Sequence, residues 1–250
     1  MKKHIPNLVT LLNLFSGCVA AIFVIQGQLA WGAVFVFLGI FFDFMDGLLA
    51  RALDARSELG LQLDSLADVV TSGVVPGLVL YKLLALALNV PDEMIDPGHW
   101  SDDNSSAFSM VNLLPLVGLI VPMSSAYRLG RFNLDEEQQH FFKGLPTPAN
   151  ALLIMSLPLI LEFQDSDVIN AQILNPVLLI VLAIASAYLL NAPVRLFSLK
   201  FRSFDFASNI LRYLFLIISL ILLLVFHFAG IPLIIILYVL MSLANQKQLH

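Results

Sequence analysis

The feature that most constrains this chain is a series of long apolar segments separated by short polar ones. A helix needs about 20 apolar residues to cross about 30 Å of hydrocarbon. Eight segments approach that length, which predicts an all-α fold: a polytopic transmembrane helical bundle of about eight spans. The predicted spans are residues 8–27, 29–50, 60–90, 109–131, 147–163, 173–192, 209–228 and 230–245.

Composition supports the same class of protein. Hydrophobic residues make up 59% of the 250 residues and charged residues 12%, against about 45–50% and about 25% in soluble domains. Such a chain is too apolar for a soluble globular protein or for a disordered one. The net charge of -5 offers no basic face for nucleic acid. The lone Cys18 excludes an internal disulfide.

We expect one integral membrane domain over residues 1–250, ending in a helical hairpin over residues 209–245. Little more than Ala229 and Gly230 separates the last two spans, and Pro232 suits the first turn of a helix. These features favour a tight connection between two antiparallel helices.

Loop charge predicts the orientation of the bundle. When the loops are numbered alternately, one set, taken with the span ends that adjoin it, holds 12 of the 13 Lys and Arg residues. The exception is Lys82, which lies well inside a span. The other set is acidic, as in residues 91–108. Cytoplasmic loops carry the excess of Lys and Arg in membrane proteins. We therefore expect a multi-pass protein of the cytoplasmic (inner) membrane with both termini in the cytoplasm.

Four aspartates lie inside or beside the predicted spans. Each costs about 2.5–3.5 kcal/mol at the centre of a membrane helix, so ionisable groups there usually indicate function. Asp43 and Asp46 are three residues apart, and Asp64 and Asp68 are four apart, so each pair shares a helix face. A short turn joins the two helices. Their acidic faces can therefore meet close to the cytoplasmic surface.

Such a cluster favours bound metal ions, because neighbouring carboxylates repel one another unless they are protonated or bind cations. Oxygen ligands favour hard divalent ions such as Mg²⁺, Mn²⁺ or Ca²⁺. Two ions about 3.5–4 Å apart are a common clamp for displacement at phosphorus. Gly47, Ala50 and Gly60 lack bulk where a substrate would approach the backbone, and Arg51 can pair with a phosphate.

Two other interpretations of the aspartates stay open on these grounds. Arg51 and Arg56 could form buried ion pairs with two of them, which would make the cluster structural. The cluster could also belong to the pathway of a divalent cation transporter. The chain shows no clear internal repeat, and the aspartates lie near one membrane face. Both observations count against a transporter.

Residues 43–68 resemble the signature of the CDP-alcohol phosphatidyltransferase family. The family pattern D-x2-D-G-x2-A-R-x8-G-x3-D-x3-D is matched at every spacing. The resemblance implies that this segment binds metal ions and CDP. It also implies a six-helix core and a homodimer. Since the acidic faces lie close to the cytoplasmic surface, we expect the active site to face the cytoplasm. The resemblance further implies transfer of a phosphatidyl group from a CDP-linked lipid to an alcohol, with release of CMP. The implied cofactor is a divalent cation, Mg²⁺ or Mn²⁺, with two ions per active site.

The resemblance also implies a role for each matched residue. Metal ligation falls to four residues, namely Asp43, Asp46, Asp64 and Asp68. Asp68 would also be the catalytic general base. The residues expected to border the CDP group are Gly47, Ala50, Arg51 and Gly60, together with Asn7 and Thr10 on one face of the first span. The structural alternative for the last two is helix capping by Asn7 and a backbone hydrogen bond from Thr10.

Further segments resemble the phosphatidylserine synthase branch of the family. They are IPNLVTLLNLFSG at 5–17, AYRLGRFN at 126–133, FKGLPTPAN at 142–150 and NAPVRLFSLKF at 191–201. The branch implies CDP-diacylglycerol and L-serine as substrates among membrane lipids. The residues expected to bind serine or a lipid phosphate are Arg128, Arg131, Lys143, Arg195 and Lys200. Ordinary positive-inside charge is the alternative. A sibling transferase that uses glycerol 3-phosphate, inositol or inositol phosphate also stays open, because the aspartate motif does not separate acceptors.

Overall fold

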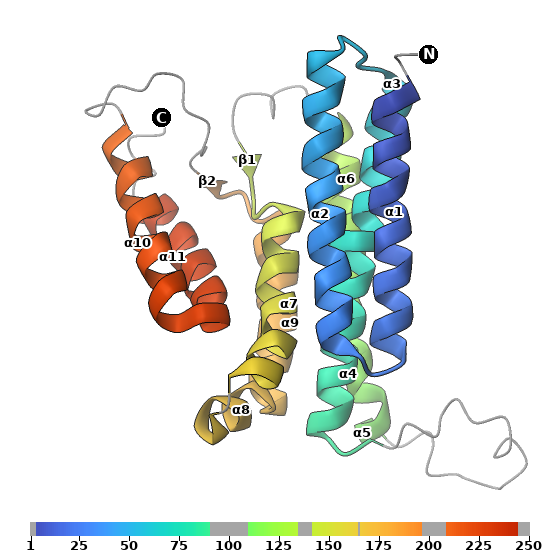
Figure 1. The fold of residues 1–250 in the computed structure, drawn as a ribbon. Helices are drawn as coiled ribbons and strands as arrows, with labels where there is room; N and C mark the ends of the chain where they lie inside the picture. The colour runs from blue at the N-terminus through green and yellow to red at the C-terminus, as the bar shows by residue number, and fades with distance from the viewer. Residues whose placement is uncertain (1–3, 91–109, 135–141, 165, 197–208, 245–250) are drawn as a thin grey trace, which may run out of the picture.

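The computed structural model is a bundle of helices (Figure 1), and it describes residues 4–90, 110–134, 142–164, 166–196 and 209–244. Within these ranges, five helices are long and apolar enough to cross a membrane, or six when one bent pair is counted as a span. The predicted polytopic helical membrane protein is confirmed.

The first half of the chain forms four long helical rods. Their elements are α1 (His4–Ile25), α2 (Leu29–Ala52), α3 (Glu58–Asp68), the π-helix η1 (Val69–Val74), α4 (Val75–Ala87), α5 (Met110–Leu113), the 3-10 helix η4 (Leu114–Leu119) and α6 (Ile120–Leu134). The turn between α1 and α2 contains Gly27 at φ +78°, a conformation that glycine adopts without steric cost. The segments α3, η1 and α4 run on as one rod, Glu58–Ala87.

The second half of the chain consists of shorter helices. Its elements are β1 (Phe142–Lys143), α7 (Thr147–Phe163), α8 (Asp167–Ile173), α9 (Pro176–Asn191), β2 (Arg195–Leu196), α10 (Ile210–Phe226), the 3-10 helix η7 (His227–Ala229) and α11 (Gly230–Ala244). Pro176 begins α9, and the side chain of Asn175 caps it by accepting from the N–H of Val177 at 2.9 Å. The bend between α8 and α9 is 57°.

The chain reverses between α10 and α11, which lie side by side in Figure 1. His227 has a φ of 50° at this reversal. Gly230 approaches the preceding helix so closely that an added Cβ would lie 2.6 Å from the carbonyl oxygen of Leu222. Gln164 ties the reversal to α7: its Nε2 donates to the carbonyl of Phe226, and its Oε1 accepts from the N–H of Ala229, both at 2.9 Å.

The number of candidate spans is lower than the eight expected from apolar length. α7 has only 17 residues, α8 and α9 are bent apart, and the stretch Ile210–Ala244 is counted as one helical stretch of 35 residues. The prediction depended on the length of apolar segments. That length does not reveal where a helix bends or where the chain reverses direction.

A two-stranded ladder is the one departure from an all-helical fold among the residues described. β1 and β2 pair antiparallel, with Phe142 opposite Leu196 and Lys143 opposite Arg195. The backbone N–H of Gly144 adds a further hydrogen bond, to the carbonyl of Val194, at 2.9 Å. The ladder joins two segments that lie about 50 residues apart in the sequence.

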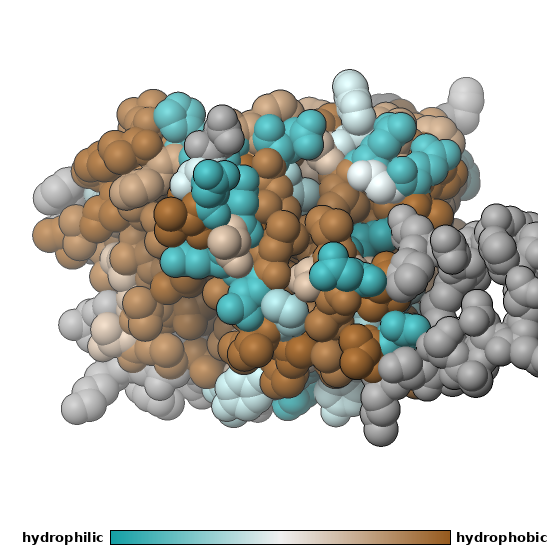
Figure 2. Space-filling view, turned by 90° about the horizontal axis from the view of Figure 1, so that it is seen from below, coloured by the Kyte–Doolittle hydropathy of each residue, from teal (hydrophilic) through white to brown (hydrophobic). Residues whose placement is uncertain are grey.

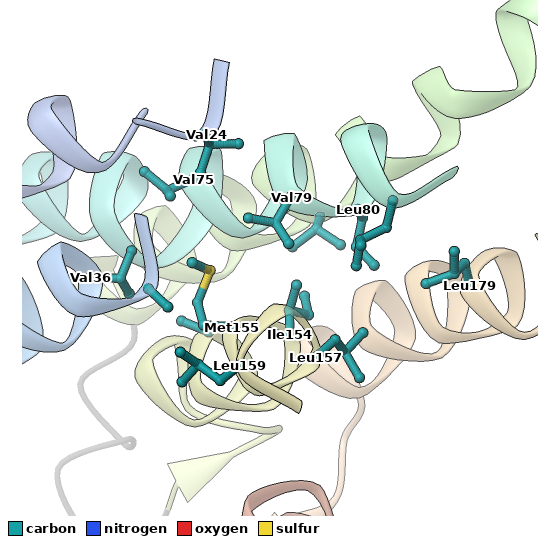
Figure 3. Close-up of a cluster of buried hydrophobic side chains, with 14 of the residues drawn as sticks. Val24, Val36, Val75, Val79, Leu80, Ile154, Met155, Leu157, Leu159 and Leu179 are labelled. Carbon is teal, nitrogen blue, oxygen red and sulfur yellow. The ribbon is translucent and has the colours of Figure 1, made fainter. Parts of the chain in front are cut away.

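The core lies where α4 and α7 meet, with contributions from α1 and α2 (Figure 3). Val75, Val79 and Leu80 of α4 and Ile154 and Met155 of α7 are all fully buried. In a membrane such contacts stabilise through close van der Waals packing, because lipid tails are as apolar as the side chains themselves. This packing holds the second half of the chain against the first.

The outer surface is apolar over much of the bundle, as expected for contact with lipid. Large side chains on α10 are exposed, among them Leu224 at 69% and Val225 at 61%. Figure 2 shows the lower end of the bundle, where brown hydrophobic residues dominate and teal hydrophilic residues lie between them.

Candidate active site

A tight turn joins the two helices that carry the four aspartates. Asp54 in this turn has a φ of 48°, in the left-handed region. Ser57 then caps α3, because its Oγ accepts from the backbone N–H of Gly60 at 3.0 Å. α1 packs against both α2 and α3. The short connection predicted between the acidic helices is confirmed, and α1 contacts both of them.

Three of the four aspartates come together in a compact acidic cluster. Carboxylate oxygens of Asp43, Asp64 and Asp68 all lie within 4.8 Å of one another. Asp68 is only 7% exposed, and the other two are partly buried. One carboxylate from α2 and two from α3 therefore converge on one point inside the bundle.

Asp46 faces a different partner. Its Oδ2 accepts a hydrogen bond of 2.5 Å from the hydroxyl of Thr10 on α1, and both residues are buried. The Thr10 hydroxyl also lies 3.1 Å from the carbonyl of Pro6, one turn back in α1. Among the described residues, the set of carboxylates close enough to share an ion comprises the other three aspartates. The structure thus places Asp46 beside that set, in contact with α1.

A polar stripe on α1 runs along the acidic helices. Asn7, Thr10 and Asn13 follow one another at three-residue spacing. Asn13 is fully buried, and its Nδ2 donates to Oδ1 of Asp68 at 3.3 Å. Sequence analysis identified the first two residues and missed Asn13, although its spacing continues the same stripe.

The acidic cluster fits a divalent cation. Oδ1 of Asp64 is buried and has no hydrogen-bond partner within the described part of the chain. An unpaired buried carboxylate oxygen is costly unless a cation satisfies it. Three carboxylates within 4.8 Å provide the all-oxygen ligand set that hard divalent ions prefer. The three aspartates can therefore hold a metal ion.

A cavity of about 600 Å³ opens beside the cluster. Its lining residues are Pro6, Asn7, Thr10, Asp46, Gly47, Ala50, Ala55, Arg56, Ser57, Glu58, Gly60, Leu61 and Asp64. Gly60 leaves room here, since an added Cβ would lie 3.0 Å from Oδ1 of Asn7. Five of the six residues predicted to border CDP thus line one cavity.

The sixth, Arg51, lies at the edge of this region with an exposed side chain. Its Nε donates to the carbonyl of Gly47 at 2.9 Å, so the guanidinium folds back along α2. Arg56 lines the cavity itself, and sequence analysis did not assign it to the nucleotide site.

The structure separates Arg128 from Arg131, although both lie on α6. Arg128 is 9% exposed, and it interacts electrostatically with Asp68. Its Nε has no hydrogen-bond partner among the described residues. Arg131 is exposed. Burial beside the acidic cluster therefore distinguishes two residues that spacing alone treats as equivalent.

The other predicted basic residues are only partly placed. Lys143 and Arg195 face each other across the β1–β2 ladder as backbone partners. Lys200 lies outside the described residues. The ladder therefore brings together two segments that resemble the same branch of the family.

Sequence analysis missed other buried polar groups. Ser72, Ser125 and Asn150 are fully buried, and their side-chain polar atoms lack hydrogen-bond partners in the part of the chain described. Ser125 lies against η1, because an added Cβ on Gly73 would be 3.0 Å from its Cβ. Isolated Ser and Asn residues in apolar helices give no sequence signal that separates a polar pocket from helix packing.

A second cavity, of about 730 Å³, lies near the α1–α2 turn, at the other end of the bundle. Trp31, Leu83 and Leu86 are among its lining residues, which include no aspartate. The chemistry of the acidic cluster therefore belongs to the smaller cavity.

Comparison with known proteins finds relatives that match much of the chain. The chain is 26% identical to the CDP-diacylglycerol–serine O-phosphatidyltransferase of Bacillus subtilis over 197 residues, which cover 77% of this chain and 89% of that protein. It is 30% identical to the archaetidylserine synthase of Methanothermobacter thermautotrophicus over 155 residues, 61% of this chain and 56% of the relative. It is also 29% identical to the Mycobacterium tuberculosis protein with the same name as the first, and spans about half of that relative (51%).

The matched region covers nearly the whole chain and includes every residue of the acidic cluster. The family model for CDP-alcohol phosphatidyltransferase matches residues 3–242. Because this match covers far more than half of the chain, the chain belongs to the CDP-alcohol phosphatidyltransferases.

Proposed function

We propose that this protein transfers the phosphatidyl group of CDP-diacylglycerol to L-serine, giving phosphatidylserine and CMP. The observation that carries the proposal is the convergence of Asp43, Asp64 and Asp68 within 4.8 Å, beside a cavity lined by small residues. The names of the relatives from Bacillus subtilis and Mycobacterium tuberculosis support serine as the acceptor.

The CDP head group of the donor binds in the 600 Å³ cavity. Gly47, Ala50 and Gly60 allow it to approach the backbone of α2 and α3, while Asn7 and Thr10 border it from α1. Arg51 and Arg56 offer guanidinium groups for the diphosphate at the mouth of the cavity. The acyl chains extend into the surrounding lipid along the apolar helices.

Asp43, Asp46, Asp64 and Asp68 hold divalent cations, Mg²⁺ or Mn²⁺, with two ions per active site. When bound, these ions neutralise the diphosphate and stabilise negative charge that develops on its oxygens. The unpartnered Oδ1 of Asp64 supports this assignment. The hydrogen bond from Thr10 orients Asp46 next to the three converging carboxylates.

Asp68 acts as the general base in a single displacement. Its carboxylate accepts the proton of the serine hydroxyl. The serine oxygen forms a bond to the phosphorus that bears diacylglycerol, and the bond from that phosphorus to the oxygen of CMP breaks. The reaction inverts the configuration at phosphorus, because no covalent intermediate forms.

Arg128 is the favoured partner for the carboxylate of serine. It is buried, it lies near Asp68, and its Nε is free of protein partners among the described residues. A guanidinium can pair with a carboxylate through two hydrogen bonds. Arg131, Lys143, Arg195 and Lys200 remain candidates for binding serine or a lipid phosphate at the rim of the site.

We further propose that the protein lies in the cytoplasmic (inner) membrane as a homodimer. Both termini and the active site face the cytoplasm. The charge of the loops supports the orientation, since 12 of the 13 Lys and Arg residues fall on one side. The family resemblance supports the dimer.

The decisive experiment measures CMP release by the purified protein in detergent with CDP-diacylglycerol and Mn²⁺. Serine, glycerol 3-phosphate, inositol and inositol phosphate are compared with no acceptor. Stimulation by serine with formation of phosphatidylserine is the expected result. Stimulation by another acceptor would support the proposed transferase reaction but show that the acceptor is not serine. No release of CMP with any acceptor, combined with metal flux into liposomes, would replace the proposed function by cation transport.

A further inference from the structure

Three segments of the chain meet around Asn13, which contacts Asp68 of the acidic cluster. Asn13 lies on α1, Gly39 on α2, and Thr71 on η1. Asn13 and Thr71 are both fully buried. The Oγ1 of Thr71 donates a hydrogen bond of 3.1 Å to the backbone carbonyl of Asn13. The backbone that carries the Asn13 side chain is thus tied to the segment that follows Asp68.

Two glycines make this close approach possible. An added Cβ on Gly17 of α1 would collide with the side chain of Thr71. An added Cβ on Gly39 would lie 2.6 Å from Cγ2 of Thr71 and 2.9 Å from Oδ1 of Asn13. Asn13 is therefore held on two sides by packing that leaves little freedom to its side chain.

The amide of Asn13 points its donor toward the active site. Its Nδ2 lies 3.3 Å from Oδ1 of Asp68. Its Oδ1 is buried without a hydrogen-bond partner in the described residues. An apolar residue of similar size would pack there without leaving a buried acceptor unpaired. The unpaired oxygen favours a role for Asn13 in the active site over one in packing alone.

The helical geometry changes at the same place. Asp68 ends α3, and the π-helix η1 begins at the next residue. Short π-helical segments within α-helices are frequent at functional sites. Here Asp68 and Thr71 both reach Asn13, one through its side chain and the other through its backbone.

We propose that Asn13 is a positioning residue that holds the carboxylate of Asp68 in the acidic cluster. It acts through its hydrogen bond to Asp68, which is both a proposed metal ligand and the proposed base. This inference rests on the role given to Asp68 under the proposed function. Loss of an outer-shell partner of a metal ligand typically lowers metal affinity or activity about 10–100-fold.

The test compares Asn13→Ala and Asn13→Leu with the wild type in two measurements. Mn²⁺ affinity is measured by electron paramagnetic resonance without substrates, and kcat and KM are measured with CDP-diacylglycerol and serine. We expect both Mn²⁺ affinity and kcat to fall about 10–100-fold, with little change in KM for serine. Folded variants that keep wild-type Mn²⁺ affinity and kcat would overturn the proposal.

Gln164→Ala is the matched control. Gln164 also bridges two segments through its amide, but it links α7 to the α10–α11 reversal, and it does not line the cavity beside the acidic cluster. This variant should keep the Mn²⁺ affinity and kcat of the wild type. An equal loss in Gln164→Ala would show that the effect of Asn13 is general destabilisation, which also overturns the proposal.

Thr71 provides a second pair of variants if the Asn13 variants do not fold. Thr71→Val removes the hydroxyl that holds the Asn13 backbone, and Thr71→Ser retains it. We expect Thr71→Val to lose Mn²⁺ affinity and Thr71→Ser to keep it; equal affinities contradict the proposal. The Mn²⁺ measurement needs no turnover. It therefore decides the role of Asn13 even if the wild type releases no CMP with any acceptor, an outcome that would remove only the proposed function.

Discussion

The hydroxyl of Thr10 lies 2.5 Å from Oδ2 of Asp46, and this hydrogen bond joins α1 to α2 beside the acidic cluster. Both side chains are buried, at 3% and 6% exposure. A hydrogen bond to a charged group contributes about 1.5–3 kcal/mol. The contact therefore ties the first helix, which lies outside the aspartate signature, to the orientation of one aspartate within it.

The first prediction concerns this contact. Thr10→Val keeps the shape of the side chain and removes the donor, so Asp46 loses a partner in a buried position. We expect kcat/KM for CDP-diacylglycerol to fall about 10–100-fold, from the free energy of a hydrogen bond to a charged group. Thr10→Ser keeps the hydroxyl and should retain most of the activity. Equal activity of the Val and Ser variants would show that the hydrogen bond is not needed.

The second prediction concerns the base. Asp68→Asn keeps the size of a residue that is 7% exposed, but an amide does not accept the serine proton. General base catalysis contributes about 10²–10⁴-fold to the rate. We therefore expect the rate of CMP release to fall at least about 10²-fold while the protein stays folded. Size-exclusion chromatography and thermal unfolding check the fold. If a folded Asp68→Asn protein turned over at nearly the wild-type rate, Asp68 would not be the general base.

The third prediction concerns the metal. The three converging carboxylates repel one another when no cation is bound. Chelation should therefore abolish turnover, and Mn²⁺ or Mg²⁺ should restore it and raise the midpoint of thermal unfolding. In the triple variant Asp43→Asn, Asp64→Asn, Asp68→Asn, the metal should no longer stabilise the fold. Full turnover in excess chelator would exclude a role for metal ions in the reaction.

The fourth prediction compares the two arginines of α6. Arg128 is buried near Asp68, whereas Arg131 is exposed. Arg128→Lys keeps a positive charge but loses the two-pronged geometry of the guanidinium. We expect the KM of this variant for serine to rise about 10-fold. This factor corresponds to the lower end of the free energy of a hydrogen bond to a charged group. Arg131→Lys, the matched control, should change that KM little. A larger rise in the KM for serine in Arg131→Lys than in Arg128→Lys would indicate that serine binds at the rim of the site, near Arg131.

The fifth prediction concerns the cavity. Gly60→Ala places a Cβ 3.0 Å from Oδ1 of Asn7 and 3.1 Å from Oγ of Ser57. This crowds the CDP site, so KM for CDP-diacylglycerol should rise while KM for serine stays near its wild-type value. Gly130→Ala is the control, because an added Cβ there meets no described atom within 4 Å. A Gly60→Ala protein with unchanged KM for both substrates would remove Gly60 from the nucleotide site.

Much of this protein follows from local patterns in its sequence. Apolar length predicted membrane helices because the hydrocarbon thickness sets how many residues a span needs. The spacing of Asp43, Asp46, Asp64 and Asp68 indicated two acidic helix faces because helical periodicity relates residues three or four apart. These patterns were sufficient for the fold class and for the acidic helix faces, of which three aspartates converge. The residues expected to border CDP came from the resemblance to a family.

Other features depended on how distant segments pack. The burial of Arg128 and the exposure of Arg131 follow from the packing of α6 against its neighbours, and no property of the two residues distinguishes them in the sequence. The pairing of Lys143 with Arg195 joins segments about 50 residues apart. The contact of Asn13 with Asp68 spans 55 positions. Helical periodicity tells which residues share a face, but only side-chain packing between helices decides which face meets which partner.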